Sequence, residues 1–98
     1  MYLVRDVFRC KPGKSRAVAD MFAKTIPIME TLDGFSRAQV MLDFVAGYWT
    51  VVLHSEVKNL TQFETHMMAF SARPEVRSAL EGYMDLVEEG HREIYRIL

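Results

Sequence analysis

The sequence predicts one α+β domain with the element order β-α-β-β-α-β. Two observations lead to this class. Apolar and polar residues alternate at both ends of the chain and in its middle, as in half-buried strands, whereas apolar residues recur every three or four positions in the two stretches between, as in amphipathic helices. No repeat, linker or low-complexity segment divides the 98 residues, so a single domain over residues 1–98 is expected.

The first strand is predicted over residues 2–10, where alternate residues form an apolar face. A Pro-Gly turn ends this strand, and Ser15 is placed to cap the helix that follows. That helix is predicted over residues 15–32 from one stripe of apolar residues. Pro27 is expected to kink its last turns.

A hairpin is predicted next. It consists of a strand over residues 35–45, a tight turn at Gly47 and a strand over residues 48–57. Phe44 is expected on the apolar face of the first of these strands, and Trp49 on the helix-facing side of the second.

A second helical region is predicted over residues 59–89, with Asn59 as its cap, Gln62 as capping-box partner and an interruption at Pro74. Gly90 is placed to end this region, and a last strand follows over residues 91–98. The buried stripe of the first part is expected to comprise Leu60, Phe63, Met67 and Phe70.

This order of elements is that of a split-βαβ, ferredoxin-like fold, with a four-stranded antiparallel sheet and the helices on one face only. The other face of the sheet mixes charged side chains with apolar ones. The apolar ones are expected to be Val7, Met41, Val52 and Tyr95. Such a face is too apolar to stay in water as a broad patch, so a homodimer with two sheets packed face to face is expected.

Composition excludes several classes of function. The net charge of −1 favours neither a nucleic acid nor a membrane as partner. The single cysteine, Cys10, cannot form an internal disulfide, and no spacing of Cys and His predicts a metal site. The sequence shows no signal peptide and no apolar run of membrane-spanning length, so a cytoplasmic location is expected.

Three stretches resemble the dimeric α/β-barrel superfamily, and within it the antibiotic biosynthesis monooxygenase-like branch. They are the turn Lys11–Lys14, the run Leu53–Met67 and the closing strand that contains Tyr95. The resemblance implies a dimeric α/β barrel with a pocket between each sheet and its own helices. It also implies a cofactor-independent, monooxygenase-like protein that binds a small aromatic or polyketide-like molecule. The alternative is a homodimer of the same fold that binds a small ligand without catalysis or is purely structural.

Asp6 and His66 are the candidate catalytic residues. Asp6 lies on the helix-facing side of the first strand, where a carboxylate is either paired with an arginine or a backbone amide, protonated, or exposed to a wet pocket. His66 flanks the apolar stripe of the second helical region, and the resemblance implies a histidine at this place. It would act as a general base toward a phenol or hydroquinone, whose anion reacts with oxygen directly. The alternative is a surface histidine that packs near the rim of the sheet.

Four further residues are candidates for the substrate-binding walls of the pocket, namely Trp49, Phe22, Met67 and Tyr83. Large aromatic and Met side chains on such faces also form ordinary cores. An open cavity that reaches Asp6 and His66 therefore favours an enzyme, and a filled core favours the non-catalytic dimer. No Gly-rich phosphate loop or Ser-His-Asp pattern indicates another reaction, and no cofactor is expected.

Overall fold

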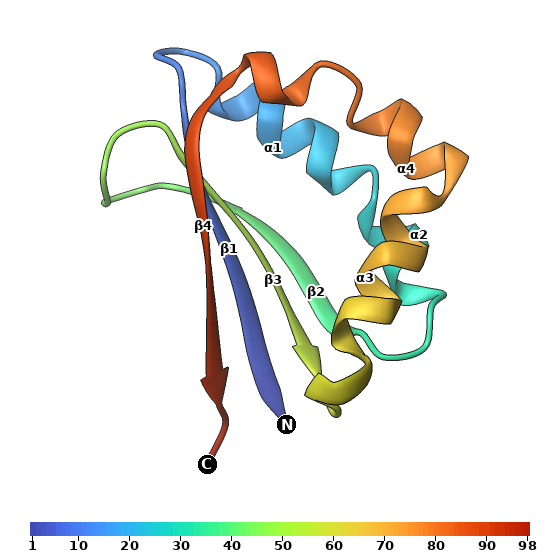
Figure 1. The fold of residues 1–98 in the computed structure, drawn as a ribbon. Coiled ribbons are helices and arrows are strands. Elements are labelled where there is room, and N and C mark those ends of the chain that lie inside the picture. Colours follow the sequence, from blue (N-terminus) through green and yellow to red (C-terminus); the bar gives the residue numbers. More distant parts are fainter.

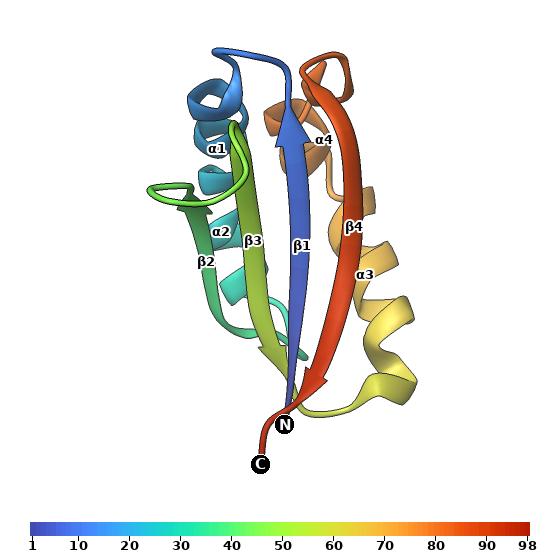
Figure 2. The same ribbon diagram turned by 90° about the vertical axis from the view of Figure 1, so that its left-hand side faces the viewer.

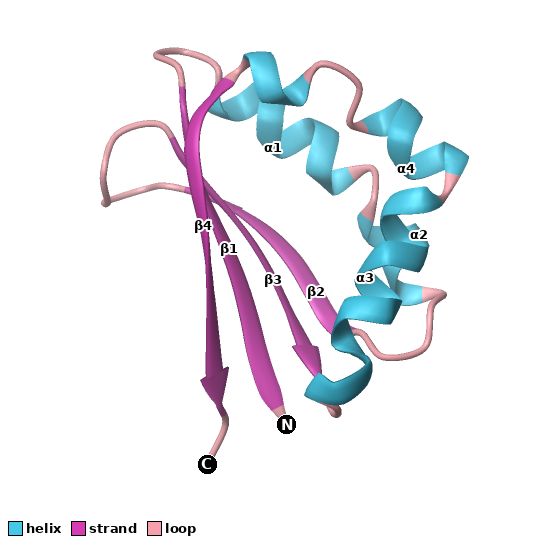
Figure 3. Cartoon of the chain, in the orientation of Figure 1, coloured by secondary structure: helices cyan, strands magenta, loops and turns pink.

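The structure is a computed structural model that describes residues 1–98, and it consists of a four-stranded antiparallel sheet with all its helices on one face (Figures 1 and 3). The strand order is β2-β3-β1-β4. The elements are β1 (Tyr2–Cys10), α1 (Ser15–Ala23), α2 (Ile26–Glu30), β2 (Ser36–Leu42), β3 (Thr50–Val57), the short 3-10 helix η1 (Leu60–Gln62), α3 (Phe63–Ala72), α4 (Pro74–Ala79), the 3-10 helix η2 (Tyr83–Asp85) and β4 (Val87–Arg96). The predicted ferredoxin-like fold is confirmed.

The central strand β1 pairs with β3 on one side and with β4 on the other (Figure 2). Its even-numbered residues face the helices. Val4 and Cys10 are fully buried there, as the alternation predicted. On the outer strand the cover is incomplete, because Ile94 lies directly opposite Val4 on the helix-facing side and is still exposed. The side of β4 that faces the helices is therefore accessible.

The core fills the space between the helices and strands β1, β2 and β3. It comprises Val4, Cys10, Val18, Ala19, Phe22, Met29, Phe35, Ala38, Val51, Leu53, Val57, Phe63, Phe70 and Val76. Burial, together with a smaller effect of Asp43, raises the pKa of the Cys10 thiol. None of the helices has the length and apolar character needed to cross a membrane.

The predicted helix over residues 15–32 is two helices, α1 and α2. The chain breaks between them because Pro27 has no N–H to give to the helix ladder, and Thr25 turns back with its hydroxyl donating to the Phe22 carbonyl at 2.7 Å. Ser15 does not cap α1. It is the first helical residue and is buried, while Lys14 is the N-cap without a side-chain bond.

The hairpin differs from expectation in the length of its loop. Strand β2 ends at Leu42 and β3 begins at Thr50. Residues 43–49 therefore form a loop instead of a tight turn at Gly47. Trp49 has a φ of +60°, in the left-handed region that cannot continue a strand. Phe44 was expected on the apolar face of a strand but lies in the loop, where it is 99% exposed.

The cap at Asn59 is confirmed, since its side-chain oxygen accepts a hydrogen bond from the Thr61 N–H at 2.8 Å. The chain first forms η1, so Gln62 precedes α3 as its N-cap and makes no capping bond. Leu60 was expected in the buried stripe but is exposed, because it belongs to η1. Pro74 begins α4, as predicted.

The end of the second helical region was predicted wrongly. The helix does not reach residue 89, because α4 ends at Ala79 and β4 begins at Val87. Gly90 is a strand residue opposite Phe8 and not a helix stop. Pairing with β1 gives this segment backbone hydrogen bonds along a formed strand, which outweighs its helical spacing of apolar residues.

Candidate ligand pocket and neighbouring polar clusters

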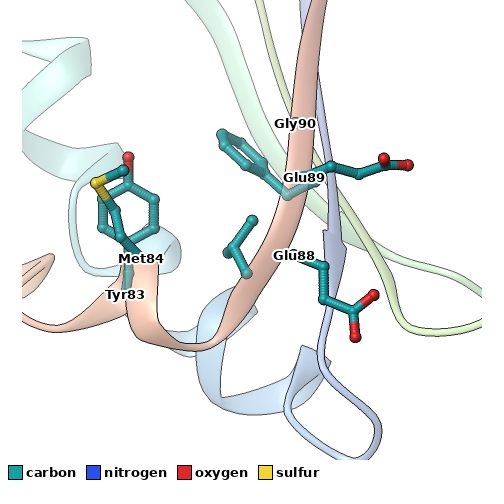
Figure 4. A pocket seen from close by; sticks show the side chains of 7 residues that line it. Tyr83, Met84, Glu88, Glu89 and Gly90 are labelled. Carbon is teal, nitrogen blue, oxygen red and sulfur yellow. The ribbon is translucent and has the colours of Figure 1, made fainter.

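A pocket of about 190 Å³ opens where η2 meets the beginning of β4 (Figure 4). Phe8 of β1 lies at its base, Tyr83 and Met84 of η2 form one wall, and residues 87–90 of β4 form the other. Figure 4 shows the carboxylates of Glu88 and Glu89 pointing away from Tyr83. The inside of the pocket is thus apolar and aromatic.

Three aromatic rings hold the base of the pocket in place. Phe8 stacks on Phe22 with 4.8 Å between ring centroids, and Tyr83 meets both rings edge-on, at 5.4 Å from Phe22 and 6.3 Å from Phe8. Phe22 is only 3% exposed. Of the predicted wall residues, Tyr83 lines the pocket, and Phe22 supports it from behind.

Gly90 lets the Phe8 ring lie against β4. A Cβ atom at residue 90 would be 3.0 Å from Cδ1 of Phe8 and 3.4 Å from the Val7 carbonyl oxygen. Any side chain at this position therefore pushes the ring or fills the pocket. Sequence reasoning missed this role, because it placed Gly90 at the end of a helix.

Asp6 lies two residues from Phe8 on the same face of β1, and Arg92 stands directly opposite it on β4. Arg92 Nε donates to Asp6 Oδ1 at 2.6 Å, and Nη2 donates to Oδ2 at 3.2 Å. The guanidinium also lies 5.2 Å above the Phe63 ring. The hydrogen bond from Arg92 to Asp6 raises the pKa of Arg92.

Pairing with an arginine is one of the alternatives that the sequence left for Asp6. Sequence reasoning did not single out Arg92 itself. A signal was present, because the first and last strands of this fold are neighbours, and residues of opposite charge form favourable pairs when they stand directly opposite each other. Finding such a pair requires the register of the two strands. The register was not known, since the last strand was predicted to begin four residues too late.

His66 belongs to a different cluster. Its ring lies 6.3 Å from the Phe35 ring, measured between centroids, and it covers the backbone of Gly34, where a Cβ atom would be 2.0 Å from the His66 Nδ1. His66 does not line the pocket of Phe8 and Tyr83. The structure therefore does not bring His66 to the same site as Tyr83.

The remaining two predicted wall residues also lie elsewhere. Trp49 is in the loop 43–49 and is 41% exposed, and Met67 packs against the core. Neither lines the pocket. No group of three or more His, Cys, Asp or Glu side chains is placed to hold a metal ion.

The open face of the sheet carries an ordered polar network centred on Glu93. Its carboxylate accepts hydrogen bonds from Arg5 at 2.9 Å, from the Tyr95 hydroxyl at 2.8 Å and from His91 Nε2 at 2.8 Å. These bonds, that of His91 foremost, lower the pKa of Glu93 from 4.5 to about 2. Val7, Val52 and Met41 stand opposite one another in a row on the neighbouring strands β1, β3 and β2, on the face where the sequence predicted them.

Solved structures of other proteins share this fold. A "putative antibiotic biosynthesis monooxygenase" from Nitrosomonas europaea aligns with 100% of this chain and 99% of its own, with a TM-score of 0.78 and 16% identity. A NIPSNAP family protein of unknown function from Agrobacterium tumefaciens covers 99% of this chain and 87% of its own, with a TM-score of 0.81 and 18% identity. An uncharacterized NIPSNAP domain protein from Burkholderia xenovorans covers 100% and 95%, with a TM-score of 0.80 and 10% identity.

No protein-family model and no curated protein matches the sequence. At these identities the likeness concerns the fold alone. The chain has the ferredoxin-like fold that the antibiotic biosynthesis monooxygenase-like and NIPSNAP proteins share, and the resemblance seen in the sequence is confirmed at this level.

We expect Gly34→Ala to be more destabilising than Gly13→Ala, although both glycines have positive φ angles of +98° and +77°. Both substitutions cost about 1–2 kcal/mol of backbone strain, but only that at residue 34 displaces the His66 ring, which costs about 1–3 kcal/mol more. Urea unfolding of both variants measures the difference. When His66→Ala is added to Gly34→Ala, the additional loss of stability at residue 34 should disappear. Equal losses of stability in Gly34→Ala and Gly13→Ala would contradict the packing role of His66.

We expect the stability of the protein to fall as the pH drops from about 4.5 toward 2, and Glu93→Gln to flatten this part of the profile. The pKa of Glu93 is depressed to about 2, so its contribution is complete above 4.5 and is lost as the pH falls through the folded-state value. Chemical unfolding at a series of acidic pH values tests this. Glu64→Gln, at an exposed glutamate of α3, is the control and should leave the slope unchanged.

Proposed function

Because this chain shares its fold with antibiotic biosynthesis monooxygenase-like and NIPSNAP proteins, we propose that it is a homodimer in which each subunit binds a small aromatic molecule. The binding site is the pocket of Phe8, Tyr83 and Gly90. The observation that carries this proposal is the apolar, aromatic interior of a pocket between the sheet and its own helices.

The size of the pocket favours a single substituted ring. Its volume of about 190 Å³ is below the range of about 300–1,000 Å³ for drug-sized ligands, while a cavity of about 150 Å³ holds benzene. Asp6 and its partner Arg92 lie two residues along β1 from Phe8, which is a distance of about 7 Å along the strand. A ligand whose ring stacks on Phe8 and whose substituent extends along β1 would therefore reach them. A hydroxyl or carbonyl group on that ring would there meet a carboxylate and a guanidinium.

The finer proposal is cofactor-independent oxygenation in this pocket. The substrate then supplies all the electrons. When a ring methylene becomes a carbonyl, CH₂ and O₂ give C=O and H₂O, so two C–H bonds break, one oxygen atom enters the substrate and the other leaves as water. Asp6 is the proton acceptor beside the pocket in place of His66, and Arg92 stabilises the substrate anion.

A non-catalytic binding protein is the second candidate, and the geometry of Asp6 favours it. Both carboxylate oxygens are already bonded to Arg92, which is the arrangement of a satisfied structural ion pair. Oxygen uptake with a panel of phenols that carry a ring methylene separates the candidates. Uptake that Asp6→Asn abolishes supports the enzyme, and ligand binding without uptake supports the binding protein.

We expect Gly90→Val to weaken the binding of 4-ethylphenol by at least about tenfold, because the new side chain displaces the Phe8 ring and fills the pocket. Isothermal titration calorimetry measures the change. Met68→Val alters an exposed residue of α3 outside the pocket and should bind as the wild type does. Unchanged affinity in Gly90→Val would place the ligand elsewhere, and wild-type protein that binds no member of the phenol panel would refute the proposed ligand class.

We expect Met41→Glu to dissociate the proposed dimer, because it adds a charge to the open sheet face beside Val52. Met68→Glu makes the same change on the helical side and should remain dimeric. Sedimentation velocity over a concentration series reports the masses, and circular dichroism shows that both variants are folded. A monomeric wild type, or a dimeric Met41→Glu, would contradict sheet-to-sheet packing.

A further inference from the structure

We propose that the loop of residues 43–49, called the arm from here on, packs against a second copy of this chain. This inference rests on the proposed dimer and adds the part that reaches across it. The exposed fractions of Phe44, Val45 and Tyr48 are 99%, 89% and 83%, and Trp49 beside them is 41% exposed. Large apolar residues gathered in one exposed segment mark an interaction site.

The arm projects on the side of the sheet that the helices leave open. Figure 1 shows it extending from the ends of β2 and β3 away from the helices, and Figure 2 shows it in front of the sheet, toward the viewer, with the helices behind. Its apolar side chains therefore do not complete the core of their own subunit. The arm that carries them stands on the open side of the sheet.

Hydrogen bonds fix the base of the arm. Thr50 N–H donates to Asp43 Oδ1 at 3.0 Å, the Thr50 hydroxyl donates to the Gly47 carbonyl at 2.6 Å, and Cys10 N–H donates to the Trp49 carbonyl at 2.8 Å. A segment held in this way loses little conformational freedom when it binds. The base of the arm thus has a fixed conformation before a partner binds.

The charges favour a second copy over a lipid surface. The only charged residue of the arm is Asp43, which is bonded to Thr50, and the arm has no Lys or Arg of the kind that attaches a loop to an anionic membrane. The neighbouring open face carries both signs in paired form, such as Arg5 with Glu93 at 2.9 Å. A face that contains both signs is able to oppose a copy of itself.

A receptor for the arm lies next to it. A pocket of about 200 Å³ at the foot of the arm is lined by Arg5, Met41, Leu42, Asp43, Ala46, Thr50 and Val52. Because the arm and this pocket are neighbours on one subunit, a two-fold axis between them places the Phe44 or Tyr48 ring of each copy in the pocket of the other.

The areas are consistent with this arrangement. A buried aromatic side chain contributes about 150–250 Å², so Phe44 and Tyr48 bring about 300–500 Å² per copy. A specific interface buries about 800 Å² per partner. The arm thus provides about half of the required area, and the open face of the sheet provides the remainder.

The test is sedimentation velocity of the full chain over a concentration series, comparing wild type, Phe44→Ser with Tyr48→Ser, and Met68→Ser as control at an exposed residue of α3. We expect the double variant to dissociate at concentrations at least about 100-fold higher than the wild type, with the control unchanged. Circular dichroism and binding of 4-ethylphenol show that the variants are folded and that the ligand pocket is intact.

A double variant that dimerises as tightly as the wild type would overturn the proposal and show that the dimer forms without the arm, and dissociation of Met41→Glu would then assign that dimer to the open face of the sheet. A wild type that is monomeric throughout would overturn both. Vesicles of phosphatidylcholine and phosphatidylglycerol provide the third part of the test. If they bind monomeric wild type but not the double variant, the partner of the arm is a lipid surface and not a second copy.

Discussion

The pairing of β1 with β4 is the constraint on which the rest of the structure depends. It takes residues 87–90 out of a helical pattern, places Gly90 against Phe8, and aligns Asp6 with Arg92. The pocket and the Asp6–Arg92 pair are both products of this one register. A shift by a single residue would turn the side chains of β4 to the opposite face and remove both features.

Much of the fold follows from local patterns in the sequence. The alternation over β1, the cap at Asn59 and the turn at Pro74 each rest on interactions within a few residues, and each was predicted correctly. The last strand was misjudged because its beginning, Val87, depends on a partner almost eighty positions away in the chain, at Cys10. Apolar spacing alone does not distinguish the two outcomes there.

The site was less accessible to sequence reasoning than the fold. Tyr83 and Phe22 were chosen for their aromatic rings on expected inner faces, and the structure brings them together. Trp49 was chosen on the same basis, but its left-handed backbone removes it from the strand. His66 was chosen for its acid-base chemistry, whereas its position is explained by packing on Gly34.

Arg92 joins three elements of the fold. It is bonded to Asp6 of the central strand, it belongs to the outer strand, and it lies over Phe63 in the first turn of α3. Loss of the guanidinium would leave Asp6 without its partner and at the same time uncover the face of the Phe63 ring. The start of α3 and the polar contact between the two strands therefore share one side chain, so that a change at Arg92 reaches the helix and the sheet together.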